Sequence, residues 1–510
     1  MKFPLSSYPG MNRFVLDWLE AEERAVGFLP RCPERELRPP GSRRSVPDEL
    51  VRALEESNRR WGSLVGDELR RWAAGGTVGI IAGQQAGFAG GPLYTLAKIA
   101  SLVRMKRSLA ERGVEATIFF WIATEDHDYA EAATLQVPVS TTVQASRGRS
   151  GPDLLTLRAT RAAASKAMVG PSKIPESLIA ELLALYDLER PSWLREGITF
   201  GDSFAELCAT AFPGEKIVFV DALLPELRRA GAELFERMLG ARKSMQEEIA
   251  ARSAAIAGAG YTPQIVARPG EDYTLLFRID PRGHRHILDG GAEAGDAASI
   301  STSALTRPLL QDFVLAPDVF VGGPAEVAYY AQIAPLHESL GVRLPRVALR
   351  GHVLVAPKRV MRSIERFDLG PAELFMPADA ILVSREAAGV AEVRAIAREA
   401  RADLTRDLTR IGELALPAEH SVARALNRSI GHIEYHFEKL TERAIRGLVR
   451  KDRERYAAVR DLSSTLFPDQ HVQDRVVGWF SCWRRWGSLL VDRVIDEVEP
   501  DGSSFKVIAP

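Results

Sequence analysis

The chain has 510 residues, of which 46% are hydrophobic and 26% charged, and this composition excludes a disordered or collagen-like protein. Its 66 Lys and Arg residues balance 67 Asp and Glu residues to a net charge of -1, so no overall field favours nucleic acid or an anionic membrane as a partner. At this length roughly two to four domains are expected.

The three cysteines lie far apart, at Cys32, Cys208 and Cys482, and form no CxxC pair. Their spacing argues against a disulfide framework and a thiolate zinc site. The first residues hold prolines, serines and a glycine where a signal peptide needs an apolar stretch. Since the longest apolar runs are far shorter than the ~20 residues of a membrane span, we expect a cytoplasmic protein.

The first part of the chain reads as helices followed by alternating strands and helices. Residues 77–82 (TVGIIA) form a short apolar run, which is typical of a strand buried on both faces. A glycine-rich loop and a helix follow, and further strands are predicted at 117–123 and 216–221. Strands that alternate with helices indicate right-handed crossovers and a parallel, doubly wound α/β sheet.

Two insertions interrupt this pattern. Residues from about 135 to 195 are irregular, and residues 263–290 read as a β-meander with turns at PGED and DPRG. The sheet is predicted to resume with strands at 318–321 and 346–355. We assign residues 1–383 to this core.

Residues 384–460 are rich in Ala, Arg and Glu and have apolar residues spaced by three or four, with a break at Pro417. This pattern predicts an antiparallel helical coiled-coil arm whose likeliest partner is a second copy of the chain. The predicted seam contains Val390, Val393, Ala397, Ala400, Leu404, Leu408, Ile411 and Ala415, then Leu426, Ile430, Ile433, Phe437, Leu440 and Ala444. Residues 461–510, with three tryptophans, are expected to pack back on the core.

Two strand–glycine–helix segments are candidate anion sites. In GQQAGFAGGP (83–92), Pro92 suits the first position of a helix, whose free N–H groups would receive a phosphate or carboxylate. The spacing matches neither the dinucleotide fingerprint nor the Walker loop, and a structural turn explains it equally well. VFVGGPAEVAYY (319–330) repeats the arrangement, so both helix starts would face one crevice if their strands end at the same edge.

Glu326, Tyr329 and Gln332 follow at three-residue steps and would share a face of the second helix. The alternative is that Tyr329 and Tyr330 are core aromatics, which we favour for Tyr330. A third candidate is TEDHD (124–128), directly after a predicted strand, because crowded carboxylates around a histidine perturb one another's pKa values.

In that segment Asp126 and Asp128 could bracket a proton or a magnesium ion, although a solvated acidic loop is also possible. Two histidine pairs carry less weight. His432 and His436 are four residues apart on a helix, without a third metal ligand, and His284 and His286 with Asp289 suit a polar hairpin face. No GxSxG context or cysteine nucleophile motif supports covalent catalysis.

Several ordered segments resemble the BshC family of cysteine-adding enzymes of bacillithiol synthesis. They are GQQAGFAGGPLYTLAK, FFWIATEDHDYAE, ITFGDSFAELCATAFPGEKIVFVDALLPELR, STSALTRPLLQDFVLAPDVFVGGPAEVAYYAQI and LFPDQHVQDRVVGWFSCWRRWG. The resemblance implies a Rossmann-like core, two insertions, a coiled-coil arm used in dimerisation, and addition of cysteine to the amino group of glucosaminyl-malate. The STSA segment (301–304) and Ala89 depart from the family pattern.

For this reaction ATP is the expected cofactor, with Mg²⁺ as a further candidate, because a carboxylate must be activated before it forms an amide. No resident metal site is assigned. We assign Asp126, His127 and Asp128 to catalysis. Substrate binding is assigned to Gln84, Gln85, Lys98, Glu125, Arg307, Glu326 and Tyr329, and nucleotide binding to Gly83, Gly90, Gly91, Gly322 and Gly323. The alternatives are a nucleotidylyltransferase acting on another small acid or amino sugar, and a coiled-coil interaction protein with a degenerate core.

Overall fold

The computed structural model describes residues 1–31, 34–41, 46–139, 153–160, 167–265, 273–289, 295–415 and 421–510. Cys32, Pro417 and the predicted PGED turn lie outside these ranges. The chain forms two compact units, one made of Met1–Val355 with Gln473–Pro510 and the other of Ala356–Val472. The second unit begins before residue 384, where the arm is predicted to start, because the helices that precede the arm pack on α19 (Arg453–Leu466).

The first unit is built on a five-stranded parallel sheet in the order β11-β10-β2-β3-β6. Its strands are β11 (Arg346–Leu349), β10 (Val319–Gly322), β2 (Val78–Gln84), β3 (Ala116–Ile122) and β6 (Val218–Asp221). The chain runs outward from β2 in one direction and from β10 in the other. The strand order therefore reverses between β2 and β10, where open α/β sheets bind their ligands. The predicted doubly wound α/β class is confirmed.

Both faces of the central sheet are covered, which explains why its strands are continuous apolar runs. Successive side chains of β3 point to opposite faces. Phe120 stacks with Phe204 of α9 on one face, whereas Phe119 makes an edge contact with Trp72 of α4 on the other. All four rings are almost completely buried.

The predicted strand at 346–355 is wrong in one respect, because it is two strands in two sheets. After β11, the chain turns at Arg350-Gly351 and continues as β12 (His352–Val355), which pairs parallel with β13 (Ser504–Ile508). β13 also pairs antiparallel with β1 (Lys2–Pro4). A Cβ at Gly351 would lie 2.0 Å from Val498 Cγ2, so the bend requires glycine.

Both insertions contain antiparallel strands. The first holds the pair β4 (Thr134–Pro138) and β5 (Leu154–Arg158). The second holds β7 (Tyr273–Ile279), β8 (Arg285–Asp289) and β9 (Ile300–Thr302), in the order β8-β7-β9. The expected meander is therefore present, and it extends further to include β9.

The helices of the first unit surround these sheets, and none of the described helices is long and apolar enough to cross a membrane. They are α1 (Arg13–Leu19), α2 (Glu23–Val26), α3 (Asp48–Arg60), α4 (Gly66–Ala73), α5 (Leu93–Glu111), α6 (Tyr129–Ala132), α8 (Glu176–Tyr186), α9 (Phe200–Ala211), α10 (Pro225–Ala230), α11 (Ala232–Gly240), α12 (Arg242–Gly258), α13 (Arg307–Leu315), α14 (Pro324–Ser339), α20 (Gln473–Val476), α21 (Trp479–Trp486) and α22 (Ser488–Glu497).

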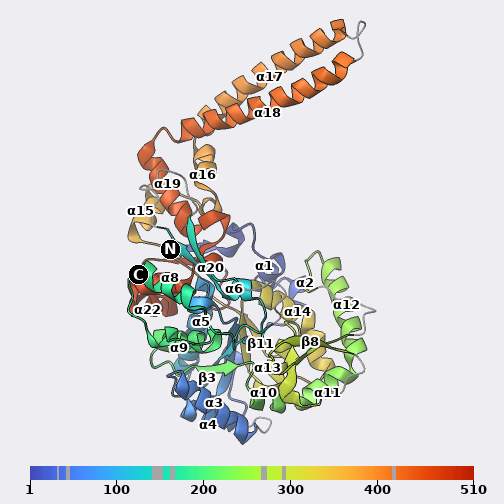
Figure 1. The fold of residues 1–510 in the computed structure, drawn as a ribbon, viewed down its shortest axis with the longest axis vertical. Coiled ribbons are helices and arrows are strands. Elements are labelled where there is room, and N and C mark those ends of the chain that lie inside the picture. The colour runs from blue at the N-terminus through green and yellow to red at the C-terminus, as the bar shows by residue number, and fades with distance from the viewer. Residues whose placement is uncertain are drawn as a thin grey trace. The chain divides into compact units, whose positions relative to one another are not determined.

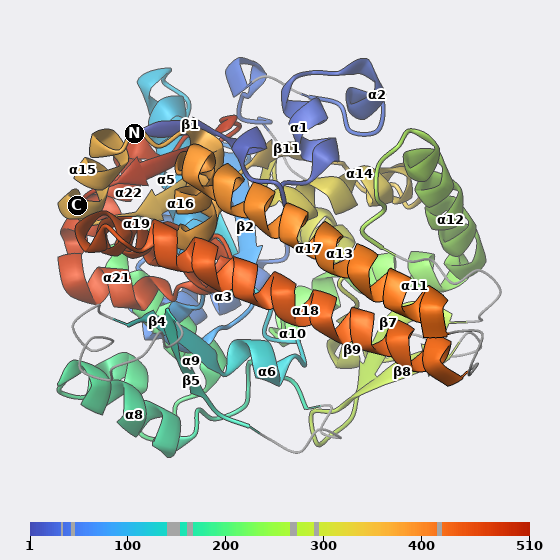
Figure 2. The ribbon, with the colours of Figure 1, turned by 90° about the horizontal axis from the view of Figure 1, so that it is seen from above.

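The second unit contains the long hairpin of α17 (Ala387–Ala415) and α18 (Ser421–Val449), which lie side by side in Figure 1 and Figure 2. The hairpin is joined by α15 (Lys358–Arg366), α16 (Ala378–Arg385) and α19. The predicted antiparallel arm is thus confirmed, but the predicted seam is only partly correct. Ala400, Leu404, Ile411, Leu440 and Ala444 are exposed, whereas Ile445, which was not assigned to the seam, is buried.

Candidate functional site

The two Gly-Gly-Pro segments, 90–92 and 322–324, lie at the ends of adjacent strands, and the helices that follow them are joined by one largely buried ion pair. Lys98 Nζ of α5 lies 2.5 Å from Glu326 Oε2 of α14, and it donates to Gly83 O at 2.7 Å and Gln84 Oε1 at 3.0 Å. Glu326 also accepts from Gly323 N at 2.7 Å. The start of α14 is therefore capped by a carboxylate of the chain itself, and the charge of Lys98 is already paired. Burial lowers the pKa of Lys98, and Glu326 opposes that effect.

The start of α5 is also occupied, by a segment from the end of the chain. Leu93 N donates to Val477 O at 2.8 Å, and Trp479 N donates to Gly91 O at 3.1 Å. The prediction that Pro92 is the first residue of this helix is wrong. Pro92 is the N-cap of α5, and it pairs with Gly478 of the returning chain. The expected set of free N–H groups is consequently incomplete at this helix.

Three of the glycines assigned to nucleotide binding, Gly83, Gly90 and Gly322, lie in close packing contacts. A Cβ at Gly90 would meet the ring of Trp479 at 2.2 Å, and one at Gly322 would meet Phe320 at 2.7 Å. Gly83 is similarly close to Trp121. Gly91 has a φ of 73° and lines a cavity. Gly323 faces Arg350, whose Nε would lie 3.7 Å from an added Cβ.

Arg350 is a buried cation beside the start of α14 that the sequence did not single out. Its Nη2 donates to Asp474 Oδ2 at 2.8 Å, and its guanidinium lies 5.4 Å from the ring centre of Tyr94. Its Nε has no hydrogen-bond partner within the described residues. A buried donor of this kind is costly unless it is satisfied, so it marks a place where an anion would be favourable.

Arg307 and Tyr329, which were both assigned to substrate binding from the sequence, form a hydrogen bond with each other. Arg307 Nη2 donates to Tyr329 Oη at 2.7 Å, and Nη1 donates to Gln311 Oε1 at 3.1 Å. Burial raises the pKa of Tyr329, which is therefore a neutral acceptor at neutral pH. Tyr330 stacks on Phe320 and is completely buried, so it is a core aromatic.

Gln332, which shares the helix with Tyr329, has a structural role. Its side chain accepts from Gln264 N and Ile265 N, each at 3.0 Å, and donates to Ile265 O at 2.7 Å. It therefore anchors the chain after α12 and lies away from the pair formed by Lys98 and Glu326.

Glu125 is buried and fully engaged by the second insertion. It accepts from Arg228 Nη2 at 3.1 Å, from Ser301 Oγ at 2.7 Å and from the Thr302 hydroxyl at 2.7 Å. Arg285 donates to its backbone oxygen at 3.1 Å. These contacts place Glu125 and the divergent STSA segment in one structural network, which fastens β9 to the end of β3.

Asp126, His127 and Asp128 form a turn at the surface. Asp126 Oδ1 accepts from His127 N at 2.6 Å and from Asp128 N at 3.1 Å, and Asp128 Oδ1 accepts from Glu131 N at 3.0 Å. Both carboxylates thus stabilise the turn and the start of α6. His127 Nδ1 lies 3.7 Å from Asp126, and its side chain is 64% exposed.

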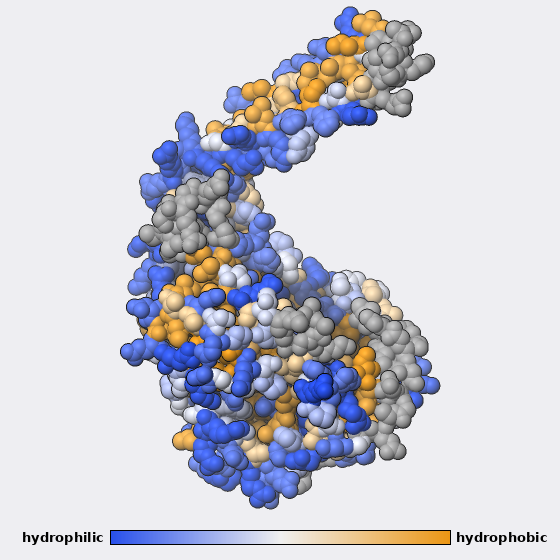
Figure 3. Space-filling view, in the orientation of Figure 1, coloured by the Kyte–Doolittle hydropathy of each residue, from blue (hydrophilic) through white to orange (hydrophobic). Residues whose placement is uncertain are grey.

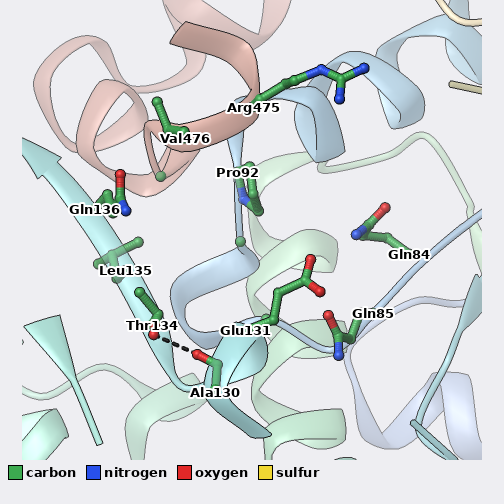
Figure 4. A pocket seen from close by; sticks show the side chains of 13 residues that line it. Gln84, Gln85, Pro92, Ala130, Glu131, Thr134, Leu135, Gln136, Arg475 and Val476 are labelled. Carbon is green, nitrogen blue, oxygen red and sulfur yellow. Dashed lines mark hydrogen bonds between the residues drawn. The ribbon is translucent and has the colours of Figure 1, made fainter. Parts of the chain in front are cut away.

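A cavity of about 200 Å³ opens at the end of β2, next to this turn. Polar and charged side chains line it, including Gln84, Gln85, Glu131, Thr134 and Arg475. Figure 4 shows Glu131 reaching into the space from α6, with Gln84 and Gln85 beside it and Arg475 on the opposite wall. Gln85 is held in place because its Nε2 donates to Asp128 O at 3.2 Å. The cavity can accept hydrogen bonds, donate them and bind charges of both signs.

The two histidine pairs are not part of this cavity. His432 and His436 are both exposed on α18. His286 Nε2 lies 3.0 Å from Asp280, which lies on the turn between β7 and β8. Within the described ranges no group of three or more His, Cys, Asp or Glu side chains is arranged to hold a metal ion.

Sequence reasoning missed Glu131, Tyr94, Arg350 and Arg475. A weak indication of Glu131 is present in the sequence, because it stands three residues after Asp128 at a helix start. The denser group of acidic residues at 125–128 was the more obvious candidate. Arg475 enters the site from the far end of the chain. Only the packing of α20 against α5 reveals it, and no spacing rule could have done so.

The comparisons with known proteins cover nearly the whole chain. The family model described as Bacillithiol biosynthesis BshC, N-terminal Rossmann-like domain, matches residues 35–296 and 292–351, and that of the BshC C-terminal coiled-coil domain matches residues 353–510. Three relatives are named "Putative cysteine ligase BshC".

The relative from Solibacter usitatus is 28% identical, over 97% of this chain and 94% of its own length. The one from Koribacter versatilis is 26% identical over 97% and 96%, and the one from Geobacillus kaustophilus is 24% identical over 85% and 84%. The predicted family is confirmed by these matches, and the chain belongs to the BshC family of bacillithiol biosynthesis.

Proposed function

We propose that this protein joins the carboxyl group of cysteine to the amino group of glucosaminyl-malate, with ATP as the activating co-substrate. Its family takes part in bacillithiol biosynthesis, and its relatives carry the name of a cysteine ligase, so the chain is assigned as a ligase. The observation that carries the finer proposal is the cavity at the end of β2, because amide, carboxylate and guanidinium side chains suited to an amino sugar bearing carboxylates stand among its apolar lining residues.

Each part of the acceptor has a chemical counterpart in the cavity. Glu131 suits an ammonium group, the amides of Gln84 and Gln85 suit sugar hydroxyls, and Arg475 suits a malate carboxylate. The cavity volume of about 200 Å³ admits a portion of such a molecule, with the rest extending into solvent. Binding in one site would convert a two-molecule encounter into a reaction between held groups.

Activation of cysteine requires a place for an anionic leaving group. The unpartnered Nε of Arg350, beside Gly323, is a donor suited to a phosphate oxygen. Lys98 and Glu326 lie at the same strand ends, although their charges satisfy each other. We assign this region, between β2 and β10, to the nucleotide, and ATP when bound would supply the energy for amide formation.

We further propose that two copies associate through the hairpin of α17 and α18 and that the protein works in the cytoplasm. Apolar residues remain exposed on both helices, among them Ile396 at 62%, Leu414 at 77% and Leu440 at 63%. Figure 3 shows hydrophobic residues gathered along the hairpin. A two-helix arm cannot cover such residues itself, whereas a second copy can.

The test is to incubate the purified chain with ¹³C-labelled cysteine, glucosaminyl-malate and ATP and to identify products by mass spectrometry. The expected product contains both substrates joined by an amide, and it should not form when ATP is left out. Turnover without nucleotide would refute ATP activation. Release of pyrophosphate with an acceptor but no cysteine would instead indicate the alternative nucleotidylyltransferase.

A further inference from the structure

We propose that Glu131 is the residue that accepts the proton from the attacking amine, an inference that rests on the proposed function. Glu131 lies on α6, whose first turn is fixed when Asp128 accepts from the Glu131 backbone N–H at 3.0 Å. Thr134 Oγ1 donates to Ala130 O at 2.6 Å and holds the other end of this short helix. The backbone that carries Glu131 is therefore well positioned, and its side chain extends into the cavity (Figure 4).

The neighbouring carboxylates are already committed to other partners. Glu125 accepts from Arg228 and the second insertion, Asp126 and Asp128 accept from backbone N–H groups, and Glu326 pairs with Lys98. By contrast, the carboxylate of Glu131 has no hydrogen bond or ion pair with any described residue. Among the described acids around the ends of β2 and β3, Glu131 is the one that lines the cavity.

The surroundings of Glu131 favour a base. The residue is accessible to solvent at the mouth of the cavity, yet the cavity walls desolvate its carboxylate enough to raise its pKa, and the charges of Asp128 and Asp126 raise it further. Two further ionisable groups lie near it: Arg475 of α20 lines the same cavity, and Tyr94 of α5 is close enough for the charge of Glu131 to raise its pKa. A carboxylate with a raised pKa takes a proton from an ammonium group more readily than an ordinary surface glutamate does.

The proton transfer completes a balanced reaction. The ammonium N–H bond breaks, the proton moves to a carboxylate oxygen of Glu131, and the nitrogen keeps the electron pair. That pair then forms the C–N bond with the carbonyl carbon of cysteine, activated as an acyl phosphate or adenylate. The bond from this carbon to the leaving phosphate or nucleotide breaks, and the leaving group departs with its electron pair. The nitrogen then loses its second proton to an oxygen of the departing group, which leaves a neutral amide.

The experiment compares the ligation kinetics of wild type and Glu131→Gln from pH 6 to pH 9. This substitution keeps the shape of the side chain and removes its basicity. We expect kcat at pH 7 to fall about 10²–10⁴-fold, a larger change than the rise in the KM for the amino sugar that follows from losing the charge opposite its ammonium group. The residual rate of Glu131→Gln should rise about tenfold for each pH unit below the pKa of the amine, because only the free amine then reacts. The matched control is Glu189→Gln, an exposed glutamate after α8, which should behave like wild type.

The outcomes separate the two proposals. If wild type makes no ligation product, the proposed function fails and the role of Glu131 fails with it. If wild type ligates and Glu131→Gln is equally fast, only the role of Glu131 is overturned. If Glu131 is the base, its substitution should matter less at high pH, where the amine is already deprotonated. A loss of rate in Glu131→Gln that is the same at every pH would therefore also overturn the role of Glu131, because it would indicate a positioning or structural defect. Circular dichroism and unfolding midpoints of the three proteins check that their folds agree.

Discussion

Lys98 Nζ lies 2.5 Å from Glu326 Oε2, and these side chains, one buried and one partly buried, come from helices that follow neighbouring parallel strands. The ion pair connects the first turn of α14 to the second turn of α5, at the point where the strand order reverses. Because Glu326 also caps the N–H of Gly323, one carboxylate occupies the position that an anionic ligand would take at this helix start. The central crevice is therefore stabilised by the chain's own charges.

Removing one member of this pair should be strongly destabilising. Glu326→Gln leaves the Lys98 ammonium buried without its counter-charge, and we expect a loss of about 3–5 kcal/mol in the free energy of unfolding. Urea denaturation monitored by tryptophan fluorescence measures it. The double variant Lys98→Met with Glu326→Leu should lose less, because neither charge is then left alone. Equal losses in the two variants would contradict this account.

Glu125 should prove structural, in contrast to the substrate-binding role assigned from the sequence. Glu125→Gln weakens the contacts to Arg228, Ser301 and Thr302, so we expect about 3–5 kcal/mol of destabilisation and faster amide hydrogen exchange around β9. The control is Glu226→Gln, which breaks a half-exposed pair with Arg229 and should cost under about 1 kcal/mol. A fully stable Glu125→Gln variant with weakened substrate binding would favour the original assignment.

His352 should make stability depend on pH. Burial, followed by the nearby charge of Arg350, lowers the pKa of His352 from 6.5 to about 4 in the folded chain. Between these pH values the unfolded chain binds a proton that the folded chain does not, so stability falls as pH falls from 6.5 toward 4. We expect wild type to lose about 1.5 kcal/mol more than His352→Gln between pH 6.5 and pH 5 in urea unfolding. Parallel curves for the two proteins would exclude His352 as the cause.

Self-association should depend on the exposed apolar residues of the hairpin. Ile396→Glu with Leu440→Glu places two charges where a second copy would bury methyl groups, and we expect the dissociation constant of the dimer to rise at least about tenfold. Light scattering after size-exclusion chromatography measures this. Ala395→Glu, also exposed and next to Ile396, is the control. A monomeric wild type, or an unaffected double variant, would place the interface elsewhere.

The enzyme's own described thiols should be inert toward reagents that react with cysteine. Cys208 and Cys482 are both buried, and burial raises their pKa values, that of Cys482 to about 12. In a Cys32→Ser background we expect labelling by iodoacetamide at pH 8 to be at least about 10²-fold slower than for free cysteine. Unfolding in urea should restore rapid labelling. Rapid labelling of the folded variant would show that one of these thiols is accessible.

The sheet was predictable from the sequence because its strands are continuous apolar runs that end in glycine or acidic residues. Periodicity also located the α17–α18 hairpin, yet it did not identify which apolar face lies within the hairpin. Leu404 and Leu440 fit the seam spacing as well as Ile445 does, and only the contact between the two helices separates them. The change from one sheet to another after β11 was also not predictable from local sequence. It occurs at Gly351, which packs against Val498, a residue far along the chain.

The sequence placed the candidate residues at the carboxyl ends of parallel strands, where the structure also has them, but it did not reveal every residue that lines the cavity. The motifs locate Gln84, Lys98 and Glu326, because local patterns of strand, glycine and helix mark the ends of parallel strands. They cannot show that Lys98 and Glu326 neutralise each other, since that depends on a contact between residues 228 positions apart. Arg475 was beyond the reach of local patterns for the same reason.

One further consequence concerns the order in which the molecule is made. Val355, where the chain leaves the first unit, and Gln473, where it returns, are joined by two hydrogen bonds of 2.7 Å. The returning segment supplies Arg475, Val476 and Gly478 to the cavity wall and Trp479 to the core. During synthesis the ribosome must therefore complete the entire hairpin before the cavity can close, and a nascent chain released too early would have a sheet but an incomplete cavity wall.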